Sequence, residues 1–288
     1  MRRLTIKMLA VLALTSVLLS LCSCDSIVNG PAPTNGRSAS NETVATKTTT
    51  EETTRATARS TTAAETSADL TEPTAKVKNL SPEWVRELPQ AQDLGTTQLI
   101  VVSAAGMNKS TAKVSMHERD NKGNWIQLFS VNGYVGKNGL VEDDDRTEGC
   151  GKTPIGIYQF NKAFGIASDP GCTIPYTKVT GDMYWSGDDS DDIPYNELVS
   201  VNEYPDLNLK TSEHLIEQSK AYQYCLSLSF NEEGTPGRGY AIFLHCYSDY
   251  KYTEGCIAIP KDNMVKIMKR LDPSCIIVID TAKNLNAS

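Results

Sequence analysis

Histidine and basic residues are scarce in this chain of 288 residues, and both shortages limit what it can do. The three histidines, His117, His214 and His245, have no cysteine at the spacing of a zinc motif, so no metal site is predicted. Lysine and arginine number 28 against 35 acidic residues, which gives a formal net charge of −7. No basic patch alternates with aromatic residues, and this absence excludes the usual nucleic-acid-binding classes.

Long hydrophobic runs are also missing. The longest, residues 8–21, follows three basic residues and spans 14 positions, whereas a membrane-spanning helix needs about 20. That length suits the core of a secretory signal, and residues 21–24, Leu-Cys-Ser-Cys, resemble a bacterial lipobox. We predict a signal peptide at 1–23, a lipid on Cys24, and export to the cell envelope, anchored at the outer face of the cytoplasmic membrane or in the cell wall. Plain secretion and an uncleaved anchor are the alternatives.

Residues 24–79 lack the apolar side chains that a folded domain needs. Between positions 31 and 75, 18 of 45 residues are Ser or Thr, and Val44 and Leu70 are the only large aliphatic residues. Such a segment cannot bury enough apolar surface to offset the entropy of ordering. We predict a disordered Thr/Ser-rich linker that serves as a stalk, with a binding role or glycosylation left open.

Residues 80–283 are sufficient for one domain, and their patterns predict a mostly β fold with a few helices. Alternating apolar residues at 111–118 and 125–131, around a turn at 120–124, predict a β-hairpin. Apolar residues at helical spacing predict a helix over 261–271. Further strands are predicted at 99–103, 153–160, 225–230, 240–246 and 275–279, with a short helix near 212–222 and a solvated acidic turn at 133–151.

The segment 240–260 carries the clearest chemical signal. An apolar run delivers His245 at the end of a predicted strand, and Cys256 follows Gly255 eleven positions later (256 − 245). A thiol attacks a carbonyl carbon as the thiolate, which a neighbouring imidazole produces by taking the proton. In an extended segment His245 shares a face with Phe243 and Ala241, whereas Cys246 points to the opposite face. The alternative is structural: a buried cysteine and an ordinary hydrogen-bonded histidine.

Gly255 adds a second reason to expect catalysis. Its missing side chain leaves room for a substrate carbonyl beside Cys256, and the backbone amides here are placed to donate to an oxyanion.

Two motifs then resemble one family. Residues 253–257, Thr-Glu-Gly-Cys-Ile after His245, resemble the signature of the L,D-transpeptidase (YkuD) family, and residues 151–158, Gly-Lys-Thr-Pro-Ile-Gly-Ile-Tyr, resemble a second family motif. The resemblance covers about 98–280 and implies a β-sandwich or barrel-like catalytic domain. It also implies that the carbonyl of Cys246 holds the imidazole and that Thr253, Thr153 and Gly156 contact substrate. The chain departs from the common pattern at Glu254, where the family usually has histidine, and at Ala258, where many members have arginine.

The resemblance implies acyl transfer on peptidoglycan stem peptides without a cofactor. Cys256 would attack the bond after the third residue of a donor tetrapeptide, and His245 would act as base and then deprotonate the acceptor amine of a neighbouring stem, giving a 3→3 cross-link. Three alternatives stay open: an L,D-carboxypeptidase, a wall-protein ligase, and a tethered wall-binding module without catalysis.

The eight cysteines do not suggest a full disulfide framework. Removing Cys22, Cys24 and Cys256 leaves five, and an odd set cannot all pair. One bridge is conceivable, either Cys225–Cys275 or Cys150–Cys172.

Overall fold

The computed structural model describes residues 79–287. The predicted signal peptide at 1–23, the lipid on Cys24 and all of the linker except Asn79 lie outside these residues. No helix in the described part is long and apolar enough to cross a membrane.

Residues 79–287 form a mostly β domain, so the predicted fold class is confirmed. Its strands are β1 (Gln98–Ala104), β2 (Thr111–Arg119), β3 (Trp125–Tyr134), β4 (Leu140–Glu142), β5 (Thr153–Tyr158), β6 (Phe160–Gly165), β7 (Tyr176–Lys178), β8 (Met183–Trp185), β9 (Leu198–Ser200), β10 (Glu213–His214), β11 (Cys225–Leu228), β12 (Phe243–Cys246), β13 (Ile257–Ile259) and β14 (Ile276–Thr281). The helices are α1 (Glu83–Arg86), α2 (Pro89–Gln92) and α3 (Lys261–Met268), with 3₁₀ turns η1 (Asp143–Asp145), η2 (Leu215–Glu217) and η3 (Ala221–Gln223).

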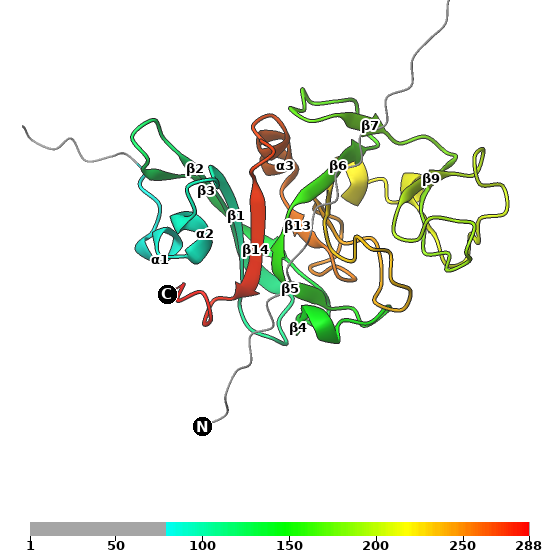
Figure 1. The fold of residues 1–288 in the computed structure, drawn as a ribbon, viewed down its shortest axis with the longest axis horizontal. Helices are drawn as coiled ribbons and strands as arrows, with labels where there is room; N and C mark the ends of the chain where they lie inside the picture. The colour runs from blue at the N-terminus through cyan, green and yellow to red at the C-terminus, as the bar shows by residue number, and fades with distance from the viewer. Residues whose placement is uncertain (1–78, 288) are drawn as a thin grey trace, which may run out of the picture. The chain divides into compact units, whose positions relative to one another are not determined.

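One large sheet organises the domain (Figure 1). Its strand order is β4-β5-β14-β1-β2-β3-β13-β12-β11-β6-β7, and a second, three-stranded sheet has the order β10-β8-β9. The large sheet is mixed: β1 and β2 are antiparallel, whereas β1 pairs with β14 and β12 with β13 in parallel. Parallel neighbours need a crossover, and helix α3 lies in the connection from β13 to β14.

The central strand β1 is buried on both faces because its alternate residues enter two different cores. Ile100 and Val102 belong to the main core, together with Leu244 from the far arm of the sheet and Met264 from α3. Since both arms of one sheet contribute to the same core, the sheet curls around it, as sandwich and barrel folds do.

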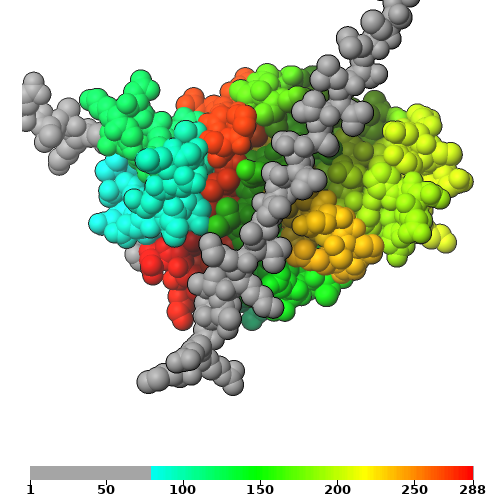
Figure 2. Space-filling model, in the orientation of Figure 1, coloured from blue at the N-terminus to red at the C-terminus, as the bar shows by residue number. Residues whose placement is uncertain are grey.

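The opposite face of β1 is covered by the two ends of the described chain. Leu99 and Val101 pack with Val85 of α1 and with Leu285 near the C-terminus. Figure 2 shows these segments, cyan and red, side by side on the surface. The helices therefore complete the layer that the sheet requires on this side.

Several sequence predictions are confirmed. The hairpin predicted at 111–131 is β2–β3, the helix predicted at 261–271 is α3, and the last predicted strand is β14. The strand predicted at 153–160 is two strands, because pairing changes from β14 to β11 between β5 and β6.

The helix predicted near 212–222 is wrong. This segment contains the short strand β10, which pairs with β8, followed by the 3₁₀ turns η2 and η3. Leu215 is fully buried in a cluster with Trp185 and Phe164, and this packing overrides the local helical preference.

Neither conceivable disulfide forms. All six cysteines between residues 79 and 287 are free, and Cys225 and Cys275 are buried in different clusters.

Candidate active site

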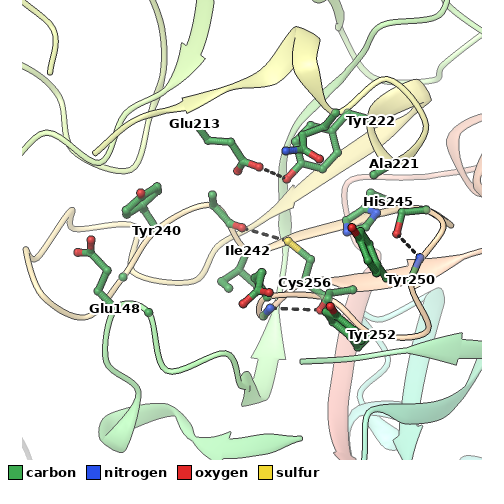
Figure 3. A pocket seen from close by; sticks show the side chains of 18 of the residues that line it. Glu148, Glu213, Ala221, Tyr222, Tyr240, Ile242, His245, Tyr250, Tyr252 and Cys256 are labelled. Carbon is green, nitrogen blue, oxygen red and sulfur yellow. Dashed lines mark hydrogen bonds between the residues drawn. The ribbon is translucent and has the colours of Figure 1, made fainter. Parts of the chain in front are cut away.

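A cavity of about 630 Å³ opens beside the 3₁₀ turns and the loops that flank β12 and β13. Cys256 and His245 both line it (Figure 3). They are nearly buried, with 8% and 5% of their surfaces exposed. The structure thus brings the two predicted residues to one site.

The register of two parallel strands sets their positions. Leu244 of β12 pairs with Ile257 of β13, so Cys256, one residue before β13, lies level with Phe243. The amide of Phe243 donates to the sulfur of Cys256 over 3.4 Å. Side chains alternate along β12: Phe243 packs in the same cluster as Cys256, whereas Leu244 and Cys246 point into the main core.

The thiol of Cys256 donates to the carbonyl of Ala241 over 3.1 Å. The predicted strand 240–246 begins only at Phe243, because Ala241 has a left-handed φ of 57° and breaks the extended backbone. Asn196 holds this turn by accepting from the amide of Ala241 over 3.0 Å. The turn is therefore what presents a carbonyl to the thiol.

Burial keeps that thiol neutral. It raises the pKa of Cys256 to about 12, and the negative charge of Glu213 adds to this effect. The Phe243 amide and Arg146 act in the opposite direction.

The imidazole of His245 is held in one tautomer. Its Nδ1 lies 2.7 Å from the carbonyl oxygen of Cys246, and because a carbonyl only accepts, Nδ1 carries the proton and Nε2 is left as the basic nitrogen. The ring of Tyr222 packs edge-on against it, with centroids 5.4 Å apart. Burial lowers the pKa of His245 to about 4, so the ring is neutral at physiological pH.

The pair is therefore a neutral thiol and a neutral base, and no hydrogen bond joins them within residues 79–287.

Two threonine hydroxyls fix the backbone of Cys256. Thr253 donates to the Cys256 carbonyl over 2.6 Å, and Thr153 donates to it over 3.2 Å. The amide of Gly255 donates to Thr253 Oγ1 over 3.2 Å, so this amide already has an acceptor instead of facing an open oxyanion position. The threonines thus stabilise the turn that carries Cys256.

The residues predicted to contact substrate divide into two groups. Thr253 lines the cavity, although its hydroxyl is used by Cys256. Thr153 is fully buried, and Gly156 lies in β5 where a side chain would collide with Tyr158. Neither of these two lines the cavity, so the structure places them as supports rather than as contacts.

His214 is not a second base of this site. Its ring stacks on Tyr184 with centroids 4.3 Å apart, and its nitrogens bond to Glu217 and to the carbonyl of Gly181.

Most of the cavity residues were not predicted from the sequence, and Arg146, Glu213 and Tyr222 are three that matter for its chemistry. Arg146 falls in the segment 133–151 that was predicted to be a solvated acidic turn, yet it is buried. Tyr222 donates to Glu213 over 2.8 Å (Figure 3), and burial raises the pKa of that carboxyl. No local pattern marks these residues, because they reach the site through tertiary contacts. Arg146 is the only arginine in the acidic segment 133–151, and this was the one feature of the sequence that could have marked it.

The fold and the site together define a β-rich domain with a thiol and an imidazole facing one cavity. No family model matches the chain, and no curated protein matches it. Among solved structures it is similar to the helical cell shape determining protein Pgp2 from Campylobacter jejuni, at 14% identity and a TM-score of 0.34, over 65% of this chain and 48% of that one. It is also similar to the Ldtfm–avibactam carbamoyl enzyme, at 11% identity and a TM-score of 0.27, over 65% and 49%. The chain spans about half the length of these proteins.

Proposed function

We propose that this protein is a peptidoglycan L,D-transpeptidase that forms 3→3 cross-links through a thioester on Cys256. The observation that carries the proposal is that the two sequence motifs meet at the nucleophile. Thr153 of the Gly-Lys-Thr-Pro motif donates to the carbonyl of Cys256, 103 positions later, and His245 lines the same cavity as the thiol. The reaction itself is inferred from the family that the two motifs resemble.

The first half of the reaction makes the acyl-enzyme. The thiol proton passes to Nε2 of His245, and the sulfur attacks the carbonyl carbon of the third stem residue. The tetrahedral intermediate collapses as the peptide C–N bond breaks, and the imidazolium returns its proton to the leaving amine of D-Ala. A thioester on Cys256 and a neutral imidazole remain. Substrate binding must first draw the thiol away from the Ala241 carbonyl.

The second half transfers the acyl group to an amine. The acceptor amine loses a proton to Nε2, attacks the thioester, and the C–S bond breaks to release the cross-linked product, after which the imidazolium reprotonates the sulfur. Glu148, Glu213 and Glu254 line the cavity, but burial raises the pKa of Glu213 and Glu254 pairs with Lys137 over 2.6 Å. Glu148 is left to attract a cationic amine, which favours an amine over water as the acceptor.

The test is a product assay with the full chain and disaccharide tetrapeptides in both the diaminopimelate and the lysine form. We expect release of D-Ala and formation of dimers, measured by mass spectrometry. A carbapenem should add to the wild-type protein as one covalent adduct seen in the intact mass. Trimmed tripeptides without dimers would instead indicate an L,D-carboxypeptidase, and products joined to another wall amine would indicate a ligase.

The variants of this assay separate catalysis from folding. Cys256→Ala should abolish both products and adduct, and His245→Ala should slow acylation by about 10²–10⁴-fold, as expected for loss of a general base. Cys172→Ala removes a partly exposed thiol outside the cavity and should change neither result. Absence of both product and adduct in the wild type would leave only the tethered wall-binding module.

We also propose that the protein is exported and anchored by a lipid on Cys24. The basis is the sequence of residues 1–24 alone. Fractionation of cells that express the wild type or Cys24→Ala tests this, because the variant should move from the membrane to the soluble fraction. Membrane retention of Cys24→Ala would contradict the lipid anchor.

A further inference from the structure

The cavity contains a buried guanidinium that the mechanism above does not use. Arg146 is 5% exposed and is the only lysine or arginine that lines the cavity within the described chain. Its Nη1 donates to the carbonyl of Arg238 over 2.8 Å and to that of Thr147 over 3.4 Å. No carboxylate of residues 79–287 pairs with it.

Among residues 79–287, the remaining donors of Arg146 have no hydrogen-bond acceptor. Its Nε is buried without a hydrogen-bond partner, and Nη2 makes no hydrogen bond within residues 79–287. The face of the Phe230 ring, 5.1 Å away, offsets part of the cost of burying the charge. A buried cation with unused donors is expensive to retain, which points to an acceptor that arrives with a ligand.

The backbone makes room for this guanidinium at two glycines. A Cβ on Gly239, where φ is 96°, would lie 2.0 Å from Nη1, and a Cβ on Gly255 would lie 3.0 Å from Nη2. Gly255 was predicted to make room for substrate, but in the structure its missing side chain makes room for Arg146. The guanidinium is therefore built into the turn that carries the nucleophile.

We propose that Arg146 binds the terminal carboxylate of the residue that leaves when Cys256 is acylated. The planar fork of a guanidinium matches a carboxylate with two parallel hydrogen bonds. Gly255 directly precedes Cys256, and the carboxylate of a terminal residue lies only about 3.6 Å, one residue length, beyond the attacked carbonyl. A donor must then end one residue after the attacked bond and carry a free carboxyl group. This inference rests on the proposed function and adds the requirement for a free C-terminus.

The test compares two donors, a tetrapeptide with a free C-terminal carboxyl group and the same tetrapeptide as its C-terminal amide. The wild-type full chain should acylate with the acid at a kcat/KM about 10- to 100-fold higher than with the amide, the loss expected when a charged hydrogen bond is removed. Arg146→Gln should lose this factor on the acid, mostly through KM, and change little on the amide. Arg146→Lys should recover part of the preference.

Arg238→Gln is the matched control. Arg238 lies over the same Phe230 ring, at 5.5 Å, but it already pairs with Asp143 at 2.7 Å and does not line the cavity. This variant should retain the wild-type preference for the acid. Equal rates for acid and amide in the wild type would overturn the proposal without the need for any variant to fold. An equal loss on both donors in Arg146→Gln would also overturn it, since that result indicates a role at the oxyanion or in folding.

A binding measurement separates this inference from the proposed function. Full-length Cys256→Ala should bind the acid about 10- to 100-fold more tightly than the amide in calorimetry, whether or not the wild type makes cross-links. Equal affinities would remove the role assigned to Arg146 while leaving acylation of Cys256 intact. If Cys256→Ala binds the acid more tightly than the amide but the wild type forms no adduct, the carboxylate site is supported and the proposed catalysis is contradicted.

Discussion

Burial governs the chemistry of the two proposed catalytic side chains. It raises the pKa of Cys256 to about 12 and lowers the pKa of His245 to about 4. Between these values the thiol holds its proton and the imidazole is neutral, so the free protein has no thiolate–imidazolium pair. In the proposed reaction, a neutral pair would let the proton move only when a substrate carbonyl is in place, and this would protect the thiol from unwanted reactions.

This neutrality predicts slow, pH-driven alkylation of the free protein. With a pKa near 12, the thiolate fraction of Cys256 at pH 7 is about 1,000-fold below that of an ordinary cysteine, and its reaction with iodoacetamide should be slower by a similar factor. Because the pKa is raised, the rate should climb about tenfold per pH unit from 6 to 9. Mass spectrometry of the peptide containing residue 256 measures this rate. A rate that levels off below pH 7 would reveal a preformed thiolate and contradict the neutral pair.

At the scale of elements, the start of β13 is joined to β5 and to the end of β3 by threonine hydroxyls. Thr153 accepts from the amide of Gly136 over 2.8 Å and donates to the carbonyl of Cys256. Gly136 in turn forms a β-bridge with Thr253. One buried hydroxyl therefore connects three segments around Cys256.

Replacing that hydroxyl should loosen the turn and unfold the domain more easily. Thr153→Val preserves the shape but leaves the amide of Gly136 without its acceptor and the Cys256 carbonyl with Thr253 as its one hydroxyl donor, so we expect the free energy of unfolding to fall by about 1–3 kcal/mol. Carbapenem acylation should slow as well, because the backbone of Cys256 is less well held. Urea unfolding and adduct formation measure the two effects.

Thr111→Val is the control, since this exposed strand threonine makes no side-chain hydrogen bond in the described structure. It should change neither unfolding nor acylation. If Thr153→Val behaves like Thr111→Val, the hydroxyl does not hold the turn.

Across the domain as a whole, a second buried histidine, in β2, holds the segment around Ser81 against the large sheet. His117 is fully buried in β2, with Ser81 Oγ 2.8 Å from Nδ1 and Ser115 Oγ 2.8 Å from Nε2. The amide of Ser81 also donates to the carbonyl of Trp125. Burial lowers the pKa of His117 to about 4. Protonation of His117 at acid pH should therefore weaken the contact between the segment around Ser81 and β2.

The pKa values of His117 and His245 predict the direction of the pH dependence. Between pH 6.5 and 4 the unfolded chain binds protons on these histidines and the folded chain does not, so the free energy of unfolding falls as the pH drops. Each shift from 6.5 to about 4 is worth about 3 kcal/mol once the pH reaches 4. His117→Gln should remove about half of this loss, as measured by urea unfolding at pH 7.5, 5.5 and 4.5.

His214→Gln provides the comparison for that experiment, because His214 is only partly buried and lies on β10 of the smaller sheet. This variant measures the effect of the His→Gln change itself at a partly exposed site. An acid-dependent loss that is equally steep in His117→Gln would show that His117 does not contribute to it.

Local periodicity was sufficient to predict β2, β3 and α3, because the alternation of the strands and the helical spacing involve residues that are close in the chain. The two motifs around Thr153 and Cys256 were identified by their resemblance to a known family. The surroundings of the Cys256 thiol could not be predicted in this way. The burial of Arg146 between two glycines, the turn at Ala241 and the placement of Glu213 arise from contacts between segments far apart in sequence. The stability of these contacts depends on packing between distant segments, and such packing produces no periodic pattern in the sequence.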